Sequence, residues 1–464
     1  MYGINKDLHL HFIGIGGIGM SGIAKVLMNL GYSISGSDLG ENETTDKLKK
    51  AGAKIYKGHA AENIKQVQIV VYSSAIDENN PEIIEAKKQK IPMIRRAEML
   101  AELMRLKYGM AVAGSHGKTT TTSFLSTIMN GLNHNPTYII GGLVKNLQDN
   151  AAIGDSDLLI AEADESDGSF LYLNPIMSII TNIDNDHLDY HKTLDNLKNA
   201  FSEFSNKVPF YGVVALNAND RPSVELLKKL KRPHIFFAVE GLELYSNQVD
   251  IFAKNVEETV DGAKFNVVVE DEVVPFEISL NGLHNISNAL GAISLARAYG
   301  GKLVDIAKAI KTFEGVSRRQ EVIYSSDSLV VIDDYAHHPT EIKATISTVK
   351  NKFPNKKLVV CFEPHRFSRT KNFWEEFIVS FEGAEELYIS PIYAASEQPI
   401  PYIDSEVLVK NINGTGIPCF YLDHTENISK VIDAHSLAQS VVLTLGAGAI
   451  SKIAKKIINE KFNK

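Results

Sequence analysis

Residues 8–31, LHLHFIGIGGIGMSGIAKVLMNLG, set the fold of the N-terminal part of the chain. Their apolar run at 8–15 predicts a strand, a glycine-rich turn follows it, and apolar residues at helical spacing over 20–31 predict a helix. The same order of strand, glycine turn and helix returns at residues 109–120, GMAVAGSHGKTT. Further β-rich runs alternate with amphipathic helical stretches along nearly the whole chain, which predicts an α/β protein with parallel sheets covered by helices.

The chain of 464 residues is too long for one hydrophobic core, and the order of its elements predicts three units. We expect the first unit over residues 1–106, the second over 107–321 and the third over 322–464. Between residues 234 and 280 apolar and polar side chains alternate. This alternation favours an antiparallel meander added to the second unit.

The formal net charge of −8 argues against a broad basic face of the kind that binds nucleic acid. The two cysteines, Cys361 and Cys419, both fall in apolar strand-like stretches, so a disulfide framework is not expected. The N-terminal residues lack the pattern of a signal peptide, and no apolar run approaches the roughly 20 residues that span a bilayer. These features predict a cytoplasmic protein that is not inserted into a membrane.

The first glycine turn carries Gly14, Gly16, Gly17 and Gly19, and Asp38 follows the next predicted strand. Such glycines let the backbone turn tightly, the N-terminus of the helix offers N–H groups to a diphosphate, and an acidic residue at this distance commonly binds a ribose hydroxyl. Taken alone, the pattern is the Rossmann fingerprint and indicates NAD. A tight turn without any ligand is the structural alternative. The fingerprint specifies a nucleotide diphosphate more firmly than it specifies NAD.

The second glycine turn resembles a phosphate-binding loop of less than the usual Walker spacing, because Val112 stands where that spacing needs a glycine. Backbone N–H groups of the loop would surround phosphate, Lys118 would neutralise the β- and γ-phosphate oxygens, and a threonine hydroxyl would hold Mg²⁺. A chance occurrence of the tripeptide GKT is the alternative. The predicted nucleotide-binding residues of this loop are Gly114, Ser115, His116, Gly117, Lys118, Thr119 and Thr120.

The presence of two phosphate-type loops narrows the class of enzyme. A dehydrogenase needs one nucleotide site, whereas a kinase or a ligase acting on a nucleotide-linked substrate needs two. An NAD-linked dehydrogenase remains the alternative from another class, but it leaves the second loop without a purpose. A non-catalytic nucleotide-binding scaffold is a third reading.

Acidic residues cluster behind two predicted strands of the second unit. Mg²⁺ prefers a few carboxylate oxygens together with substrate phosphates, and a carboxylate at a strand end beside a phosphate loop is placed as a Walker-B acid would be. The alternative for any single residue is a helix N-cap or a solvated acidic loop. The cluster consists of Glu162, Asp164, Glu165, Asp167, Asp184, Asp186, His187 and Asp189.

A second set of polar residues opens an otherwise apolar helix after residue 283. The amides of Asn285 and Asn288 match the donor and acceptor edge of adenine, and the imidazole of His284 suits stacking on it. A helix N-cap is the alternative. Arg318 and Arg319 follow in a loop between a helix and a strand, a place suited to stabilising charge on a transferring phosphoryl group.

Two predicted strands of the third unit end in polar residues, and ligands of open α/β sheets bind outside such strand ends. Arginines and a histidine behind the second of these strands indicate an anchor for a carboxylate or a phosphate. A surface run of charge is the alternative. The two stretches are residues 333–339 after the first of these strands and residues 363–370, which contain His365, Arg366 and Arg369, after the second.

Ten motifs in this order resemble the Mur ligase family, and the resemblance runs essentially from end to end. The two glycine loops are each moderately specific, whereas all ten motifs together are highly specific. They are HFIGIGGIGMSGIA, GSHGKTTTT, EADESDGSF, NIDNDHLDYH, GLHNISNALGA, GVSRRQE, DDYAHHPTE, EPHRFSRT, YAASEQPI and LGAGAI.

The resemblance implies a Rossmann-like N-terminal domain for a UDP-sugar, a central P-loop-type ATPase domain and a C-terminal dinucleotide-fold domain for an amino acid. It implies that Lys118 contacts the β- and γ-phosphates of ATP, that Thr119 and Glu162 bind a first Mg²⁺, and that His187 binds a second. It also implies Arg319 on the γ-phosphate, and the expected catalytic set is Lys118, Glu162, His187 and Arg319. Four further groups of ligand-binding residues are implied, namely His284, Asn285 and Asn288 on adenine, Asp334 on the ATP ribose, Gly14, Gly16, Gly17, Gly19 and Asp38 on the UDP-sugar, and Tyr335, His337, His365, Arg366 and Arg369 around the amino acid.

The implied reaction joins L-alanine to the lactyl carboxylate of UDP-N-acetylmuramate through an acyl phosphate, a step of peptidoglycan precursor synthesis. ATP and Mg²⁺, or Mn²⁺ in its place, are the implied cofactors. The alternative within the family is a muropeptide ligase of cell-wall recycling, which adds a tripeptide to the same sugar. The run HRFSRT at 365–370 favours alanine. We expect a monomer or a weak homodimer, with no nucleic-acid partner.

One position departs from the pattern of the family. Ser396, in YAASEQPI, stands where a glycine is more usual. The serine is therefore expected to adopt the backbone angles of a glycine.

Overall fold

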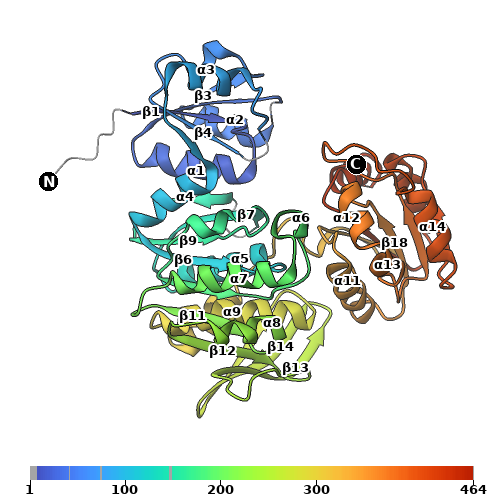
Figure 1. Ribbon diagram of the computed structural model, residues 1–464. Coiled ribbons are helices and arrows are strands. Elements are labelled where there is room, and N and C mark those ends of the chain that lie inside the picture. Colours follow the sequence, from blue (N-terminus) through green and yellow to red (C-terminus); the bar gives the residue numbers. More distant parts are fainter. Residues whose placement is uncertain (1–7, 41, 74–75, 146–148, 463–464) are drawn as a thin grey trace. The chain divides into compact units, whose positions relative to one another are not determined.

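The computed structural model describes residues 8–40, 42–73, 76–145 and 149–462. The described chain divides into two compact units. The first consists of residues 1–256, 265–277 and 285–314, and the second of residues 257–264, 278–284 and 315–464. Three sheets with helices on their faces run through these units, as the predicted α/β class requires (Figure 1). Within the described ranges, no helix is long and apolar enough to cross a membrane.

The first sheet is parallel throughout and has the order β3-β2-β1-β4-β5. The chain therefore leaves β1 in one direction and later returns to its other side at β4, which places the first glycine turn at a topological switch point. The strands are β1 (His9–Ile13), β2 (Ser33–Asp38), β3 (Lys54–Lys57), β4 (Ile69–Tyr72) and β5 (Met93–Arg95), and the helices are α1 (Ile18–Asn29), α2 (Glu43–Lys50), η1 (Ala61–Ile64), α3 (Pro81–Gln89) and α4 (Arg96–Arg105).

Alternation of side chains along β1 feeds two cores. Leu10 and Phe12 pack in the core that contains α1 and α4, whereas Ile13 packs with Ile64 and Ile83 on the other side. Each of these side chains is at most 3% exposed. Successive strand residues point to opposite faces, so this sheet is covered by helices on both.

The second sheet has ten strands in the order β15-β14-β13-β12-β11-β10-β6-β9-β7-β8. Its strands are β6 (Tyr108–Ala113), β7 (Thr137–Val144), β8 (Asp149–Ala152), β9 (Leu158–Glu162), β10 (Met177–Ile180), β11 (Val213–Asn217), β12 (His234–Val239), β13 (Ile251–Thr259), β14 (Gly262–Val269) and β15 (Glu272–Ile278). Its helices are α5 (Lys118–Gly131), η2 (Ser169–Tyr172), α6 (Leu188–His191), α7 (Leu194–Asn206), α8 (Arg221–Glu225), η3 (Leu226–Lys228), α9 (Leu283–Ala298) and α10 (Leu303–Ile310).

The predicted antiparallel meander was wrong for its first strand. β12 pairs parallel with both β11 and β13, so it belongs to the parallel part of the sheet. Phe236, Phe237, Ala238 and Val239 are all buried, and the continuous run of buried residues is typical of a strand covered on both faces. The alternating stretches that follow are β13, β14 and β15, which are sheet neighbours joined by turns of two residues.

The third sheet has the order β16-β17-β21-β18-β19-β20, in which only β16 is antiparallel to its neighbour. One core packs α11, α13 and α14 on one side of it, and another packs α15 and α16 on the other. The strands are β16 (Glu321–Ser325), β17 (Leu329–Asp334), β18 (Lys357–Phe362), β19 (Glu386–Ile389), β20 (Cys419–Tyr421) and β21 (Ser440–Leu445), and the helices are α11 (Pro339–Lys352), α12 (Phe367–Asn372), α13 (Trp374–Ile378), α14 (Ser405–Asn413), η4 (Thr425–Asn427), α15 (Ile428–His435) and α16 (Ile450–Lys461).

Two details of the third sheet follow the sequence. Cys361 in β18 and Cys419 in β20 are buried free thiols, and burial raises the pKa of each to about 12, so both are unreactive. Ser396 has a φ of 70°, which confirms that a serine adopts the left-handed conformation expected at this turn. Ala395 before it has a φ of 47°.

The left-handed conformation at residue 396 predicts how substitutions act there. Ser396→Gly removes the strain of a side chain in this region but adds freedom to the unfolded chain, so its effect on the free energy of unfolding should stay within about 1 kcal/mol. Ser396→Val, with a β-branched side chain, should destabilise the turn by more than that. Thermal unfolding of the two variants beside the parent measures the difference, and equal midpoints for glycine and valine would contradict the backbone assignment.

Candidate active site

The second glycine turn follows β6, which lies between β10 and β9 in the sheet. Gly114 has a φ of 141° and Gly117 a φ of 79°, conformations that L side chains rarely adopt. A Cβ atom at Gly114 would collide with the hydroxyl of Thr181, and one at Gly117 would collide with the amide of Asn288. Both glycines are therefore required by backbone angle and by space, and α5 begins directly after them at Lys118.

The ammonium group of Lys118 is folded back into this turn. Its Nζ donates to the carbonyl oxygens of Gly114 (2.6 Å) and Ser115 (3.2 Å) and lies 2.9 and 2.8 Å from the two carboxylate oxygens of Glu165. Burial opposes the charge, but the carboxylates of Glu165, Asp164 and Glu162 raise the pKa of Lys118 above its usual value. The loop thus holds a permanent cation beside the N-terminus of α5.

The carboxylate of Glu165 is fully buried. Burial raises its pKa to about 7, although Lys118 opposes the shift. His187 Nε2 lies 3.8 Å from Glu165 Oε1, and His191 Nε2 lies 2.8 Å from the backbone oxygen of Glu165. Glu165 therefore connects the phosphate loop to the acidic loop that carries His187.

Glu162, at the end of β9, has the surroundings of a magnesium ligand. Its Oε1 and Oε2 lie 3.1 and 3.0 Å from the hydroxyl of Thr119, and Oε2 also accepts a hydrogen bond from the Gly141 N–H at 2.9 Å. A separation near 3 Å is what two oxygen ligands of one Mg²⁺ show, since each binds at about 2.0–2.1 Å. The carboxylate and hydroxyl chemistry of this pair fits Mg²⁺.

The loop after β10 holds the phosphate loop from its other side. Asn182 Oδ1 accepts a hydrogen bond from the His116 N–H (2.8 Å), and the His116 ring lies 2.9 Å from an Asp184 carboxylate oxygen. The hydroxyl of Thr181 donates to the His116 backbone oxygen at 2.6 Å. These contacts fix the backbone of the loop before a ligand arrives, and they use the N–H groups of Ser115 and His116 to do so.

Asn285 and Asn288 lie in the first turns of α9, and both are buried. The Asn288 amide packs against Gly117, and its Nδ2 lies 3.5 Å from Asn285 Oδ1. The structure therefore brings the phosphate loop and the two asparagines together. This is the arrangement that a nucleotide spanning both would need.

The first glycine turn is closed by Asp38 rather than left open. The Gly16 N–H donates to Asp38 Oδ2 at 2.9 Å, and a Cβ at Gly16 would lie 2.9 Å from that oxygen. Gly17 is the N-cap of α1. Asp38, at the end of β2, therefore lies against the turn, as the Rossmann pattern predicts.

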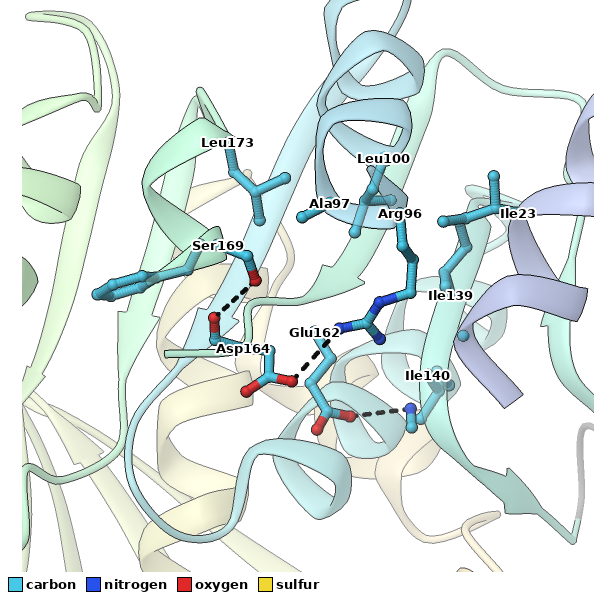
Figure 2. Close-up of a pocket in the computed structure, with 13 residues that line it drawn as sticks. Ile23, Arg96, Ala97, Leu100, Ile139, Ile140, Glu162, Asp164, Ser169 and Leu173 are labelled. Carbon is cyan, nitrogen blue, oxygen red and sulfur yellow. Dashed lines mark hydrogen bonds and ion pairs between the residues drawn. The ribbon is translucent and has the colours of Figure 1, made fainter. Parts of the chain in front are cut away.

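A pocket of about 210 Å³ lies between α1 and α4 on one side and β7, β9 and η2 on the other. Figure 2 shows Arg96 reaching toward Asp164, with Glu162 beside them. Arg96 Nη2 is 3.4 Å from Asp164 Oδ2, and Gly19 of the first glycine turn is a lining residue. The pocket thus extends from the first glycine turn to the carboxylates beside the second.

The second compact unit holds its own group of predicted residues at the end of β17. Asp334 is buried and accepts hydrogen bonds from the N–H groups of Gln320 (2.7 Å) and Ala336 (2.8 Å). Burial raises the pKa of Asp334 to about 6, with Arg319 opposing the shift. The guanidinium carbons of Arg318 and Arg319 lie 4.7 and 5.0 Å from the centre of the Tyr335 ring.

The residues expected around an amino acid gather at this edge of the sheet. The His337 ring lies 5.1 Å from the Tyr335 ring and 6.0 Å from the His365 ring. Tyr393, which the sequence did not single out, stacks on His365 at 5.5 Å with an interplanar angle of 11°. Arg369 lies in α12 and is buried, whereas the Arg366 side chain, at the N-cap of the same helix, is exposed.

Near them, β21, a glycine turn and α16 form a third strand–turn–helix unit. A side chain of the protein, that of Glu363, lies at the N-terminus of its helix. Glu363 Oε2 accepts a hydrogen bond from the Ile450 N–H at 3.1 Å, and a Cβ at Gly448 would collide with this oxygen. Glu363 is 2% exposed, and burial raises its pKa. A carboxylate of the protein therefore occupies the place where a dinucleotide fold would bind phosphate.

Three family models match the chain in sequence. They are described as the Mur ligase family catalytic domain (residues 9–108), the Mur ligase middle domain (112–296) and the Mur ligase glutamate ligase domain (318–448). The chain belongs to the Mur ligase family. This confirms the three-domain α/β class, while the precise domain boundaries at 106 and 321 stay predictions.

Individual Mur ligases match over the full length. The UDP-N-acetylmuramate–L-alanine ligase of Endomicrobium trichonymphae is 42% identical over 454 residues, which cover 98% of this chain and 99% of the relative. The crystal structure of a UDP-N-acetylmuramate–alanine ligase from Thermotoga maritima matches with a TM-score of 0.82 and 27% identity, covering 98% and 99% of the two chains. A murein peptide ligase from Psychrobacter arcticus shares the fold, with a TM-score of 0.73 and 23% identity over 97% and 98%.

The roles of the individual residues in this Mur ligase stay predictions, but their positions are defined. The first unit brings together the two glycine turns, Glu162, His187, Asn285 and Asn288, and the second brings together His284, Arg319, Asp334 and the amino-acid set. Sequence reasoning gave no role to Arg96 and no separate role to Glu165. Two adjacent arginines, Arg95 and Arg96, lie at the junction of β5 and α4, and this pair could have indicated an anion-binding role for Arg96.

Two half-buried imidazoles, those of His284 and His365, contribute a predicted pH dependence to the stability of this Mur ligase. Burial lowers the pKa of His284 to about 4, and burial together with Arg369 and Arg366 lowers the pKa of His365 to about 4. In the unfolded chain both return to an ordinary value near 6.5. Between about pH 6.5 and pH 4 the unfolded state therefore binds protons at these two rings that the folded state does not, so the two rings lower the free energy of unfolding as the pH falls, while the raised pKa values of Glu165 and Asp334 act in the opposite direction.

NMR of the histidine ring protons measures these values directly, with His284→Gln and His365→Gln variants assigning the two signals. Both rings should stay neutral at pH 6. A ring that titrates near pH 6.5 in the folded protein would contradict the lowered pKa, and a His365→Gln variant whose unfolding midpoint changes between pH 6.5 and 4.5 as the parent's does would contradict the linkage.

Proposed function

We propose that the chain joins L-alanine to the lactyl carboxylate of UDP-N-acetylmuramate while ATP is converted to ADP and phosphate. The observation that carries the proposal is the full-length similarity to ligases of that name. The geometry supports it independently, because a nucleotide-linked substrate and ATP require two phosphate sites, and the first unit has two glycine turns with a pocket that extends from the first turn to the carboxylates beside the second. A murein peptide ligase is the weaker reading, since the structure of that name shares the fold at lower identity.

In the first step a lactyl carboxylate oxygen attacks the γ-phosphorus of ATP, and ADP leaves. Positioning and neutralisation of charge supply most of the catalysis in such a transfer. Lys118 provides a cation at the phosphate loop, and this cation must exchange Glu165 for phosphate oxygens to reach the nucleotide. The N-terminus of α5 adds backbone N–H groups. Thr119 and Glu162 would hold Mg²⁺, which neutralises phosphate charge when it is bound.

In the second step the amine of alanine attacks the acyl carbon and phosphate leaves, while the nitrogen loses a proton. The buried guanidinium of Arg369 suits the carboxylate of the amino acid. The low pKa of His365 keeps its ring neutral, so it can accept a hydrogen bond from an ammonium group without repelling it. His284, also neutral, suits stacking on adenine.

The cellular setting of this reaction is the assembly of peptidoglycan precursors, on which cell shape and division depend. We place the protein in the cytoplasm, where ATP and the UDP-sugar are available, as a monomer or a weak homodimer without a nucleic-acid partner. Mn²⁺ is expected to replace Mg²⁺, because both bind oxygen ligands in octahedral geometry.

A phosphate-release assay with UDP-N-acetylmuramate and ATP tests the function over a panel of amino acids and the tripeptide of cell-wall recycling. L-Alanine should give the highest kcat/KM. Turnover of the tripeptide in preference to alanine would favour the recycling ligase, and release of phosphate without any amine acceptor would point to a different reaction.

Lys118→Ala should lower kcat by orders of magnitude while the UDP-sugar still binds, because the substitution removes the cation of the phosphate loop and leaves the first glycine turn intact. Isothermal titration with UDP-N-acetylmuramate measures the retained binding. Unchanged turnover in this variant would overturn the assignment of the loop to ATP.

Arg369→Ala should raise the KM for alanine by about tenfold or more, since a charged hydrogen bond to a carboxylate contributes about 1.5–3 kcal/mol. Lys371→Ala, on the exposed side of the same helix, is the matched control and should leave KM unchanged. A selective rise in the KM for ATP would contradict the placement of Arg369 at the amino acid.

A further inference from the structure

The pocket between α4 and β9 has an apolar wall and a charged end, and a ligand must match both. One wall is apolar and includes Ile23, Leu100 and Ile139 (Figure 2). The opposite end carries the carboxylates of Glu162 and Asp164. Among the pocket-lining residues, all of which lie in the described part of the chain, Arg96 is the single cation.

Arg96 is fixed at the junction of two elements. It is the first residue of α4, directly behind β5, and its guanidinium packs against the first glycine turn, where a Cβ at Gly19 would lie 2.7 Å from Nη1. The same guanidinium reaches Asp164 at 3.4 Å, with the two side chains 32% and 40% exposed. Arg96 therefore stands between the diphosphate turn and the magnesium-type carboxylate, with a carboxylate as its present partner.

An anionic substrate group faces a barrier at this point. The lactyl carboxylate must approach the γ-phosphate of ATP, and on the way it meets the negative charge of Asp164, beside Glu162, which would hold Mg²⁺. Like charges at short range repel strongly where water is partly excluded. A guanidinium is suited to remove this repulsion, because its planar fork binds a carboxylate through two parallel hydrogen bonds.

We infer that Arg96 is the residue that binds and orients the lactyl carboxylate of the UDP-sugar, with Asp164 holding the guanidinium in place until the substrate displaces it. The inference rests on the proposed function, since it concerns the acid substrate of that reaction. The apolar wall of the pocket then faces the methyl group of the lactyl ether and the sugar ring, and the carboxylate lies on the side of Glu162. Arg96 is a binding and positioning residue in this scheme and takes no proton.

The test compares two ligands that differ at the lactyl group. UDP-N-acetylmuramate carries the lactyl carboxylate and UDP-N-acetylglucosamine lacks it, so the ratio of their dissociation constants measures recognition of that group. Titration calorimetry of the parent protein should show tighter binding of UDP-N-acetylmuramate. In Arg96→Ala the affinity for this ligand should fall by about ten- to a hundredfold, the loss expected for a charged hydrogen-bonded pair, while the affinity for UDP-N-acetylglucosamine stays nearly constant.

Two further variants sharpen the comparison. Arg96→Lys keeps the charge but loses the planar fork, so it should give an intermediate ratio. Arg297→Ala is the matched control, because Arg297 forms an ion pair with Glu272 at the same 3.4 Å distance and with side chains 39% and 40% exposed, outside the pocket. This control should leave both affinities unchanged.

Each outcome decides the question. If both ligands lose affinity equally in Arg96→Ala, the residue acts on the diphosphate or on the shape of the glycine turn, and the inference is overturned. If the ratio is unchanged and both ligands bind normally, Arg96 has no part in binding and the inference is again overturned. Failure of the proposed function looks different, because the parent protein itself would then release no phosphate with alanine and the UDP-sugar.

Discussion

The buried charge of Lys118 is the constraint from which the arrangement of the first unit follows. An ammonium group removed from water needs anions and carbonyl oxygens around it, and here it has Glu165 together with the carbonyls of the glycine turn. Those carbonyls are within reach only because Gly114 and Gly117 take backbone angles closed to other residues. The loop after β9 that carries Glu165 therefore holds the phosphate loop in its conformation through this ion pair.

Two carboxylates three residues apart take different surroundings in this loop. Glu162 is tied to the Thr119 hydroxyl and to a backbone N–H, whereas Glu165 is enclosed and paired with the lysine. Glu162 therefore offers oxygen ligands that suit Mg²⁺, whereas Glu165 binds the ammonium group of Lys118. The short separation in sequence lets one turn of backbone serve the metal and the lysine together.

Local sequence was sufficient for the parts of the molecule that repeat a strand, a glycine turn and a helix. The spacing of glycines predicts both turns, and the strand ends predict Asp38, Glu162 and Asp334, because parallel strands deliver their last residues to one edge. The strand 234–239 was misassigned because the strands that follow it in the sequence alternate, while its own burial depends on helices distant in sequence.

Arg96 and Tyr393 escaped notice for a related reason. Their positions next to Gly19 and His365 arise from packing between segments far apart in the chain, which no local spacing records. Lys118 and Glu165 also differ in how far the sequence predicts them. A lysine after two glycines can be recognised in sequence, but which of several nearby acids pairs with it depends on the path of the loop.

Glu363 gives the third strand–turn–helix unit a different character from the other two. Its carboxylate is attached to the chain that it caps, so it competes intramolecularly with dissolved anions for the N-terminus of α16. Inorganic phosphate, a product of turnover, consequently finds this helix end already occupied by a carboxyl group. The glycine turns of the first unit are suited to phosphate, whereas this one is blocked by the chain's own carboxyl group. Phosphate released by the reaction therefore does not inhibit the enzyme by binding here.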